Sequence, residues 1–342
     1  MTGPRNQKSV ILDRLDEQIV CCLQISPRVP FRRIAQVLNV SERTVARRYK
    51  AMCRAGVLQV VANISPVALG ESDWIVRVRT RPDAVLGTAQ ALARRPDVSW
   101  VSVNAGGSEI VCSVRSHTQE EREHLLLDRL PRSAAVLDLT LSVILRRFVG
   151  GKATDLVAEP GVLTPEQAEQ LAVERQVPRY ASIPVVESLD PGDYAMFRVL
   201  ARDGRAPVGA LARAAQVSEG RAGRRLDTLL GSGVVYLHVD LSTTALGYPI
   251  AAHLWLTVPP DRLESTCEAI AEHPEALFVA AISGRSNVLA WIACRSLDGL
   301  YQYVTERIGL LESVHSVEVS PVLQTLKQSG THVDGDLLTV HK

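Results

Sequence analysis

Apolar side chains recur every three or four positions through three consecutive stretches between residues 11 and 58, which is the spacing of helices with one buried face. Asn39 and Val40 form a short turn between the second and third stretches. Ser41 is a typical N-cap for the third helix, and Gly56 is a typical residue for its end. Two helices joined by so short a turn predict a helix-turn-helix. The predicted inner faces are Leu12, Leu15, Ile19 and Leu23, then Phe31, Ile34, Ala35 and Leu38, then Val45, Tyr49, Met52 and Cys53.

The same pattern returns 177 residues later. Residues 11–58 align without gaps with residues 188–235, and the aligned identities include Ser41 with Ser218 and Gly56 with Gly233. Further on, the tripeptide Ala-Leu-Gly occurs at 68–70 and again at 245–247. Repetition at one fixed distance indicates duplicated structural units. We therefore expect two copies of one two-part module, joined by a polar segment that contains prolines.

The second part of each module alternates strand and helix patterns. "DWIVRVRT" alternates apolar and polar residues, "PDAVLGTAQALARRP" has helical spacing, and "VSWVSVNAGGSEIVCSVRS" predicts a hairpin that turns at Gly106 and Gly107. "TQEEREHLLLDRL" predicts another helix, and "AVLDLTLSVIL" predicts a last strand. The order βαββαβ is that of a ferredoxin-like unit, and residues 249–330 predict the same order.

The expected fold class is α+β, with two copies of a winged-helix-like helix-turn-helix domain, each followed by a ferredoxin-like βαββαβ domain. Residues 1–66 and 67–150 form the first copy, residues 151–186 form a linker, and residues 187–248 and 249–330 form the second copy. The tail at 331–342 has no clear pattern, and we expect it to be disordered.

The third helix of the first copy carries a basic stripe opposite its apolar face. Such a helix can enter a major groove, where arginines bond phosphates or guanine edges. Residues 1–66 hold 11 Lys/Arg and four Asp/Glu, although the formal net charge of the whole chain is +1. A solvated helix face is the plainer alternative, but the turn and the serine cap favour DNA binding. The predicted DNA-binding residues are Ser41, Arg43, Thr44, Arg47, Arg48, Lys50 and Arg54.

The second copy predicts a weaker DNA-binding head. Residues 187–248 hold seven Arg and seven Asp/Glu, so fewer phosphates can be neutralised. Its third helix also contains Gly220 and Gly223, each of which costs about 1 kcal/mol of helix stability relative to alanine. Arg221, Arg224 and Arg225 are the candidate DNA contacts of this head, and a degenerate copy kept for packing is the alternative.

Other features narrow the class of protein. Six scattered cysteines without a CxxC pair indicate neither a zinc module nor a disulfide framework, so we expect no metal site and no cofactor. No apolar run approaches the roughly 20 residues of a membrane span, and no signal peptide opens the chain, so we expect a cytoplasmic protein. A P-loop, HExxH, GxSxG and a dinucleotide fingerprint are all absent, so we expect no enzymatic activity.

The series "LD..D", "IA..LNVS...V.RR...M..AGVL" and a βαββαβ unit with a glycine hairpin resembles the leucine-responsive and asparagine-regulator (Lrp/AsnC) family of bacterial transcription regulators. The likeness covers about residues 11–148 and 188–329, as a tandem version of the family. It implies a regulator that binds double-stranded promoter DNA through the helix-turn-helix. It also implies oligomers that pair through the ferredoxin-like sheets and, in many members, an amino acid bound between neighbouring domains.

The glycine hairpins are the effector-binding candidates that this resemblance implies. The first copy offers Gly106, Gly107 and Glu109, and the carboxylate could meet an ammonium group. The second copy offers Gly284, Arg285 and Asn287, where the arginine would favour a carboxylate or another anion. Glycine at such a turn has the alternative role of allowing a positive φ. We therefore expect two pockets with different ligands, or one empty pocket.

Two questions stay open from the sequence. An apolar sheet face must be buried, and the two ferredoxin-like domains could pair with each other or with a second chain, so we expect a homo-dimer or a larger homo-oligomer. Two other functions are also compatible with the resemblance. Sirohaem decarboxylases look like paired modules of this family that hold a tetrapyrrole and no longer bind DNA, and a DNA-independent small-molecule sensor is the third reading.

Overall fold

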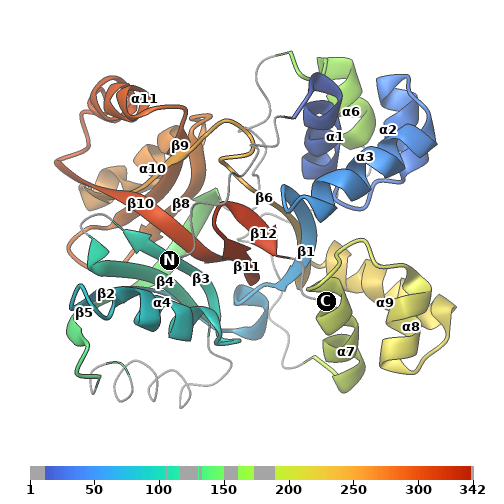
Figure 1. The fold of residues 1–342 in the computed structure, drawn as a ribbon, viewed down its shortest axis with the longest axis horizontal. Coiled ribbons are helices and arrows are strands. Elements are labelled where there is room, and N and C mark those ends of the chain that lie inside the picture. Colours follow the sequence, from blue (N-terminus) through green and yellow to red (C-terminus); the bar gives the residue numbers. More distant parts are fainter. Residues whose placement is uncertain are drawn as a thin grey trace, which may run out of the picture.

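The computed structural model describes residues 12–104, 107–115, 130, 133–149, 161–172 and 189–339. Figure 1 shows two groups of helices on one side of the molecule and a large β-structure on the other. Within the described ranges, none of the helices combines the length and the apolar character that crossing a membrane requires.

The first three-helix unit consists of α1 (Arg14–Ile25), α2 (Phe31–Leu38) and α3 (Glu42–Arg54). Asn39 has the left-handed conformation (φ +53°) and ends α2. Ser41 caps α3 as expected, since its side chain accepts a hydrogen bond from the backbone N–H of Thr44. Gly56 follows α3 with φ +70°. The residues between α2 and α3 therefore form the short turn that the sequence predicts.

Part of the predicted linker belongs to this unit. Residues 161–172 contain α6 (Pro165–Ala172), and Val162 and Leu171 are buried in the same core as α1, α2 and α3. Gln167 donates from Nε2 to the carbonyl oxygen of Val37 (3.0 Å), and Gln18 donates to the carbonyl oxygen of Val162 (3.0 Å). The expectation of a plain linker through these residues was therefore wrong, because two apolar side chains fix them against α1 and α2.

The second three-helix unit consists of α7 (Pro191–Leu200), α8 (Val208–Ala215) and α9 (Glu219–Gly231). Gln216 has the left-handed conformation (φ +55°) after α8, and Ser218 caps α9 by accepting from the backbone N–H of Arg221. Asp190 and Asp193 form a reciprocal capping box at the start of α7. Turn and cap thus occupy positions 177 residues after those of the first unit.

Two strands that the sequence pattern does not predict join the helical units. The strand β1 (Leu58–Ile64) pairs antiparallel with β6 (Val235–Leu241) as a two-stranded ribbon. Val61 pairs with His238, the residue 177 positions later, and each end of one strand pairs with the opposite end of the other. The ribbon therefore has a pseudo-two-fold axis through Val61 and His238, and a short 3-10 helix η1 (Val67–Leu69) follows β1.

The first sheet follows the predicted order. It contains β2 (Asp73–Thr80), α4 (Val85–Ala93), β3 (Val98–Asn104), β4 (Glu109–Arg115) and β5 (Val136–Val149). The predicted helix at 118–130 lies outside the described residues, apart from Leu130. One face of this sheet shares a core with α4, and this face includes Val76, Val101 and Cys112.

The second sheet gives the full βαββαβ order. It contains β7 (Ile250–Thr257), η5 (Pro260–Arg262), α10 (Leu263–Ala271), β8 (Ala276–Ile282), β9 (Val288–Cys294), α11 (Leu297–Gln302), the π-helical η6 (Tyr303–Ile308) and β10 (Ser316–Gln328). Leu254, Val279 and Ala290 face a core that includes Cys267 and Tyr303.

The two sheets close on each other through two long strands. The first half of β5 pairs with β2, and its second half pairs with β8 of the other sheet. In the same way β10 pairs with β7 and then with β3. The eight strands therefore form a closed ring, and the sheets pair within one chain. Between them lies an apolar layer of Ile75, Val111, Ile144, Trp255, Phe278, Ala280, Ile282 and Leu289.

A polar network crosses this layer. Asn104 on β3 donates from Nδ2 to Nδ1 of His253 on β7 (2.9 Å) and to Oγ of Ser320 on β10 (3.0 Å). Ser102 donates to Oδ1 of the same amide (2.9 Å). His253 is 4% exposed, and burial lowers its pKa to about 3. The imidazole is therefore neutral, with Nδ1 as the acceptor.

The tail is ordered through Thr339, which corrects the expectation of disorder. β11 (Thr331–Asp334) and β12 (Leu337–Thr339) extend the sheet beyond β10. The backbone N–H of Leu338 donates to the carbonyl oxygen of Gly56 (2.8 Å), directly after α3. A Cβ at Gly56 would lie 2.5 Å from the carbonyl oxygen of Leu338, so the close contact requires glycine.

Replacing the buried histidine should change how stability depends on pH. The unfolded chain binds a proton on His253 below about pH 6.5, whereas the folded chain does not until about pH 3, so acid lowers the free energy of unfolding. His253→Gln keeps an acceptor for Asn104 and should remove about 2 kcal/mol of the loss between pH 7 and pH 5. Urea unfolding at both pH values measures this, with the exposed His315→Gln as control. An unchanged pH dependence in His253→Gln would contradict a buried neutral imidazole.

Candidate functional site: two unequal basic helices

The basic stripe of α3 lies on the surface. Arg43, Arg47, Lys50 and Arg54 are all exposed, while Val45 and Met52 on the opposite face are buried. At the start of the helix the hydroxyl groups of Ser41 and Thr44 lie 2.8 Å apart. The structure therefore presents four cations and a hydroxyl pair on one accessible face, which is the composition that phosphate and base contacts require.

Arg48 is engaged inside the unit instead. Its guanidinium forms ion pairs with Asp13, the N-cap of α1, and with Asp16 (3.1 Å). The hydrogen bond from Arg48 lowers the pKa of Asp13. The prediction that Arg48 contacts DNA needs correction to this extent: its described contacts tie α3 to α1, so it positions the helix.

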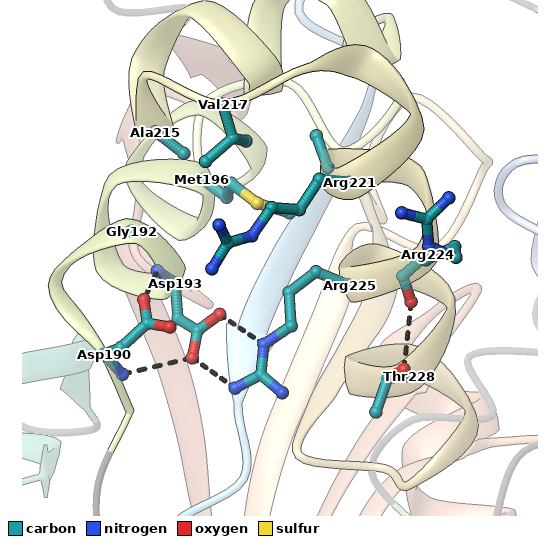
Figure 2. Close-up of a pocket in the computed structure, with 11 residues that line it drawn as sticks. Asp190, Gly192, Asp193, Met196, Ala215, Val217, Arg221, Arg224, Arg225 and Thr228 are labelled. Carbon is teal, nitrogen blue, oxygen red and sulfur yellow. Dashed lines mark hydrogen bonds and ion pairs between the residues drawn. The ribbon is translucent and has the colours of Figure 1, made fainter.

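The same pair recurs in the second unit, as Figure 2 shows. Arg225 donates from Nε to Oδ1 of Asp193 (2.7 Å), and that carboxylate is 2% exposed. Burial raises the pKa of Asp193, but the hydrogen bonds from Arg225 and from the backbone of Asp190 outweigh burial and leave it lowered. Arg225, like Arg48, therefore positions its helix, while 41% of its side chain stays exposed.

Two other arginines of α9 stay accessible. Arg221 and Arg224 are exposed and line an open groove of about 620 Å³ beside the start of α7. Figure 2 shows both side chains on α9, where Thr228, one turn after Arg224, donates to the carbonyl oxygen of Arg224 (2.9 Å). The helix α9 thus presents two exposed arginines where α3 presents four exposed cations.

A reciprocal clamp fixes the two heads against each other. Arg28 donates to the carbonyl oxygens of Gly204 (2.7 Å) and Ala206 (3.0 Å). Arg205, 177 residues later, donates to those of Pro27 (2.6 Å) and Val29 (2.8 Å). These arginines were not predicted as important, although the repeat aligned them and carried the signal. Together with the β1–β6 ribbon, the clamp holds α3 and α9 in one fixed relation.

At the first glycine hairpin, Gly107 has the positive φ that glycine allows, while Glu109 already forms contacts within the chain. Gly106 lies outside the described residues, and Gly107 has φ +63° with no atom within 4 Å of a built Cβ. Glu109 pairs with Arg77 (Nη2 to Oε1 2.7 Å) and accepts from Oγ of Ser320 (3.1 Å). Its carboxylate therefore already has a cation and a donor, and the predicted ammonium contact would have to compete with both.

The second hairpin is also engaged internally. Asn287 donates from Nδ2 to the carbonyl oxygen of Val258 (2.7 Å), and its Oδ1 accepts from the backbone N–H of Val258 (2.9 Å). Gly284 has φ +118°, so the turn itself requires glycine. Arg285 is exposed. Of the predicted effector residues in this copy, Arg285 alone presents an accessible charged group.

Metal ligands do not gather in the part of the chain that the structure describes, where no group of three or more His, Cys, Asp or Glu side chains could hold an ion. The cysteines are unbridged, and burial raises the pKa of Cys112 and Cys267 to about 12. Thiols in this state are poor nucleophiles at neutral pH.

Comparisons with known proteins agree with the geometry of the helical unit and the sheet. Residues 12–52 match the AsnC-type helix-turn-helix domain, and residues 251–331 match the Lrp/AsnC ligand binding domain. An uncharacterized HTH-type transcriptional regulator of Pyrococcus furiosus is 30% identical over 136 residues, which cover 39% of this chain and 92% of the relative. The HTH-type transcriptional regulator Ptr1 of Methanocaldococcus jannaschii is 25% identical over 140 residues, which cover 41% of this chain and 95% of Ptr1.

A solved structure resembles the whole chain in fold. The siroheme decarboxylase NirDL, in complex with an iron-uroporphyrin III analogue, superposes with a TM-score of 0.60 over 95% of this chain and 94% of its own. The sequences are 13% identical, so the likeness concerns the fold alone.

Removing one of the positioning arginines should destabilise the fold. Arg225→Ala leaves the buried carboxylate of Asp193 without its cation, and we expect a loss of about 1 to 3 kcal/mol in the free energy of unfolding. Arg224→Ala, on the exposed side of the same helix, should cost less than about 0.5 kcal/mol. Urea unfolding of both variants measures the difference, and equal losses would show that the Arg225–Asp193 pair does not hold α9.

Proposed function

Because the chain belongs to the Lrp/AsnC family of helix-turn-helix transcriptional regulators, we propose that it recognises a specific double-stranded DNA sequence through α3 and regulates transcription from that site. The exposed stripe of Arg43, Arg47, Lys50 and Arg54 is the observation that carries this proposal. The positioning of α3 by Arg48 supports it, because a helix that must fit a groove needs a fixed orientation.

We propose further that the chain is a tandem of two family modules that pair with each other. The reciprocal ribbon, the clamp of Arg28 and Arg205, and the exchange of β5 and β10 between the sheets support this arrangement. Two heads on one pseudo-two-fold axis fit a pseudo-palindromic site, with α3 as the stronger head and α9 as the weaker. Assembly into larger homo-oligomers belongs to the same proposal.

The sheets would bind the ligand that regulates DNA binding. A small-molecule effector, such as an amino acid, bound against them would change DNA affinity through the ribbon that connects the sheets to the heads. The sequence match of residues 251–331 to the Lrp/AsnC ligand binding domain supports an effector. Among the hairpin residues, Arg285 is the accessible one, so an anionic group is the favoured partner there.

We propose that the chain is not an enzyme, although its fold resembles that of a tetrapyrrole decarboxylase. Pockets for drug-sized ligands measure about 300–1,000 Å³. The cavity that the described residues line between the sheets has about 120 Å³, which is small for a tetrapyrrole. The accessible basic face of α3 also favours a nucleic-acid partner.

Loss of one exposed arginine should weaken DNA binding without weakening the fold. Arg47→Ala should lower affinity for DNA from upstream of the chain's own gene about tenfold and reduce the salt slope by about one, because one phosphate contact is lost. Fluorescence anisotropy of labelled DNA between 50 and 200 mM salt measures both. An unchanged affinity and slope would overturn the role of α3.

The two heads should contribute unequally. Arg224→Ala, the corresponding change on α9, should lower affinity for the same DNA less than Arg47→Ala does, since fewer exposed cations surround it. The same anisotropy series compares the two variants. A larger loss from Arg224→Ala would reverse the ranking of the heads and make α9 the main contact.

A further inference from the structure

A cavity of about 120 Å³ lies between the two sheets, at the end next to the β1–β6 ribbon. Asn63, Tyr236 and His238 of the ribbon line it together with residues of both sheets. His238 is also the residue through which the pseudo-two-fold axis of the ribbon passes. The cavity is therefore shared by the two halves of the chain and touches the element that joins the two heads.

The walls of this cavity are not equivalent in the two halves. On one side Trp100 pairs across the strands with Ser113, and on the other side Phe278 pairs with Trp291. All four line the cavity, and the rings of Trp100 and Trp291 meet edge to face with centroids 4.4 Å apart. The space between the two halves is therefore asymmetric, because Ser113 of the first sheet stands where the second sheet has Trp291.

The groups around this space are mainly hydrogen-bond donors beside flat apolar surfaces. Arg115 and Arg147 both line it, and both also bond the buried carboxylate of Asp73. Two other contacts of Arg115, to Asn63 and Tyr236, are 3.4 Å long and therefore weak. The indole N–H groups of Trp100 and Trp291 are buried and lack a hydrogen-bond partner among the described residues, which is costly for a donor.

We propose that this cavity binds a small aromatic carboxylate of one ring. Its volume is comparable with the engineered cavities of about 150 Å³ that accept benzene. The ring would lie against the aromatic walls, and the carboxylate would accept from Arg115 and Tyr236 in place of their long contacts. This site is distinct from the glycine hairpins, and its regulatory meaning rests on the proposed function.

Such a ligand would act on the heads through the ribbon. Asn63 belongs to β1 and Tyr236 to β6, so a carboxylate that draws Arg115 away from them changes the contacts of both strands. The ribbon continues directly into Val57 and Gly56 at the end of α3. Binding in the cavity is therefore coupled to the placement of the DNA-binding helix.

Calorimetric titration of the purified full chain with benzoate tests the site, with benzyl alcohol as the uncharged control. We expect saturable binding of benzoate at one site per chain, and at least tenfold weaker binding of benzyl alcohol. Equal binding of the two would overturn the role of Arg115, and no binding of benzoate would overturn the site.

Variants locate the binding. Ser113→Leu should fill the cavity and weaken benzoate binding at least tenfold, and Trp291→Phe, which keeps a ring but removes the N–H, should weaken it severalfold. Trp255→Phe changes a tryptophan of the same sheet outside the cavity lining and should leave binding unchanged. If all three variants bind like the parent, the ligand binds elsewhere and the proposal fails.

The DNA titration is repeated with saturating benzoate, so that the two proposals can fail separately. A change in DNA affinity that Ser113→Leu abolishes supports a regulatory site. If benzoate binds but DNA affinity does not change, the coupling through the ribbon is wrong. If benzoate binds to a chain that binds no DNA, the ligand site is supported and the proposed function is wrong.

Discussion

The exchange of strands between the two sheets is the constraint on which the rest of this structure depends. A strand of 14 residues and another of 13 each pair first with their own sheet and then with the other. Neither sheet could keep its inner face dry alone, and the edge that each would expose is paired by the other. The ribbon and the clamp of Arg28 and Arg205 are reciprocal in the same way, because residues 177 positions apart make corresponding contacts in each.

The helical units show how two copies of one pattern can take different roles. Arg48 and Arg225 hold corresponding helices by corresponding ion pairs, so the two three-helix units share this way of fixing the third helix. The exposed faces differ, since α3 presents four cations and α9 presents two arginines. In α9, Gly220 precedes the first of these arginines and Gly223 lies between the two. The buried positions conserve the shape of each unit, while the exposed positions set how strongly it could hold a phosphate backbone.

Much of the fold could be predicted from the sequence because helical and strand periodicities are local. The caps at Ser41 and Ser218 and the ends of β2 and the β3–β4 hairpin needed no knowledge of distant contacts. The strands β1 and β6 could not be predicted in the same way, because each is completed only by the other. α6 depends likewise on tertiary contacts with α1 and α2, and the C-terminal hairpin depends on its contact with Gly56. At the site, spacing placed Arg48 on the right helix, but only its distance to Asp16 revealed that the guanidinium was already engaged.

Because the two halves pair within one chain, their pairing does not depend on the concentration of the protein. Two separate subunits dissociate on dilution, so the fraction of a dimeric regulator able to bind both half-sites falls as the cell makes less of it. Two halves joined by covalent bonds and by a shared sheet experience a high and constant effective concentration of each other. A single molecule then carries both heads at any abundance, so contact with both half-sites would require no second molecule.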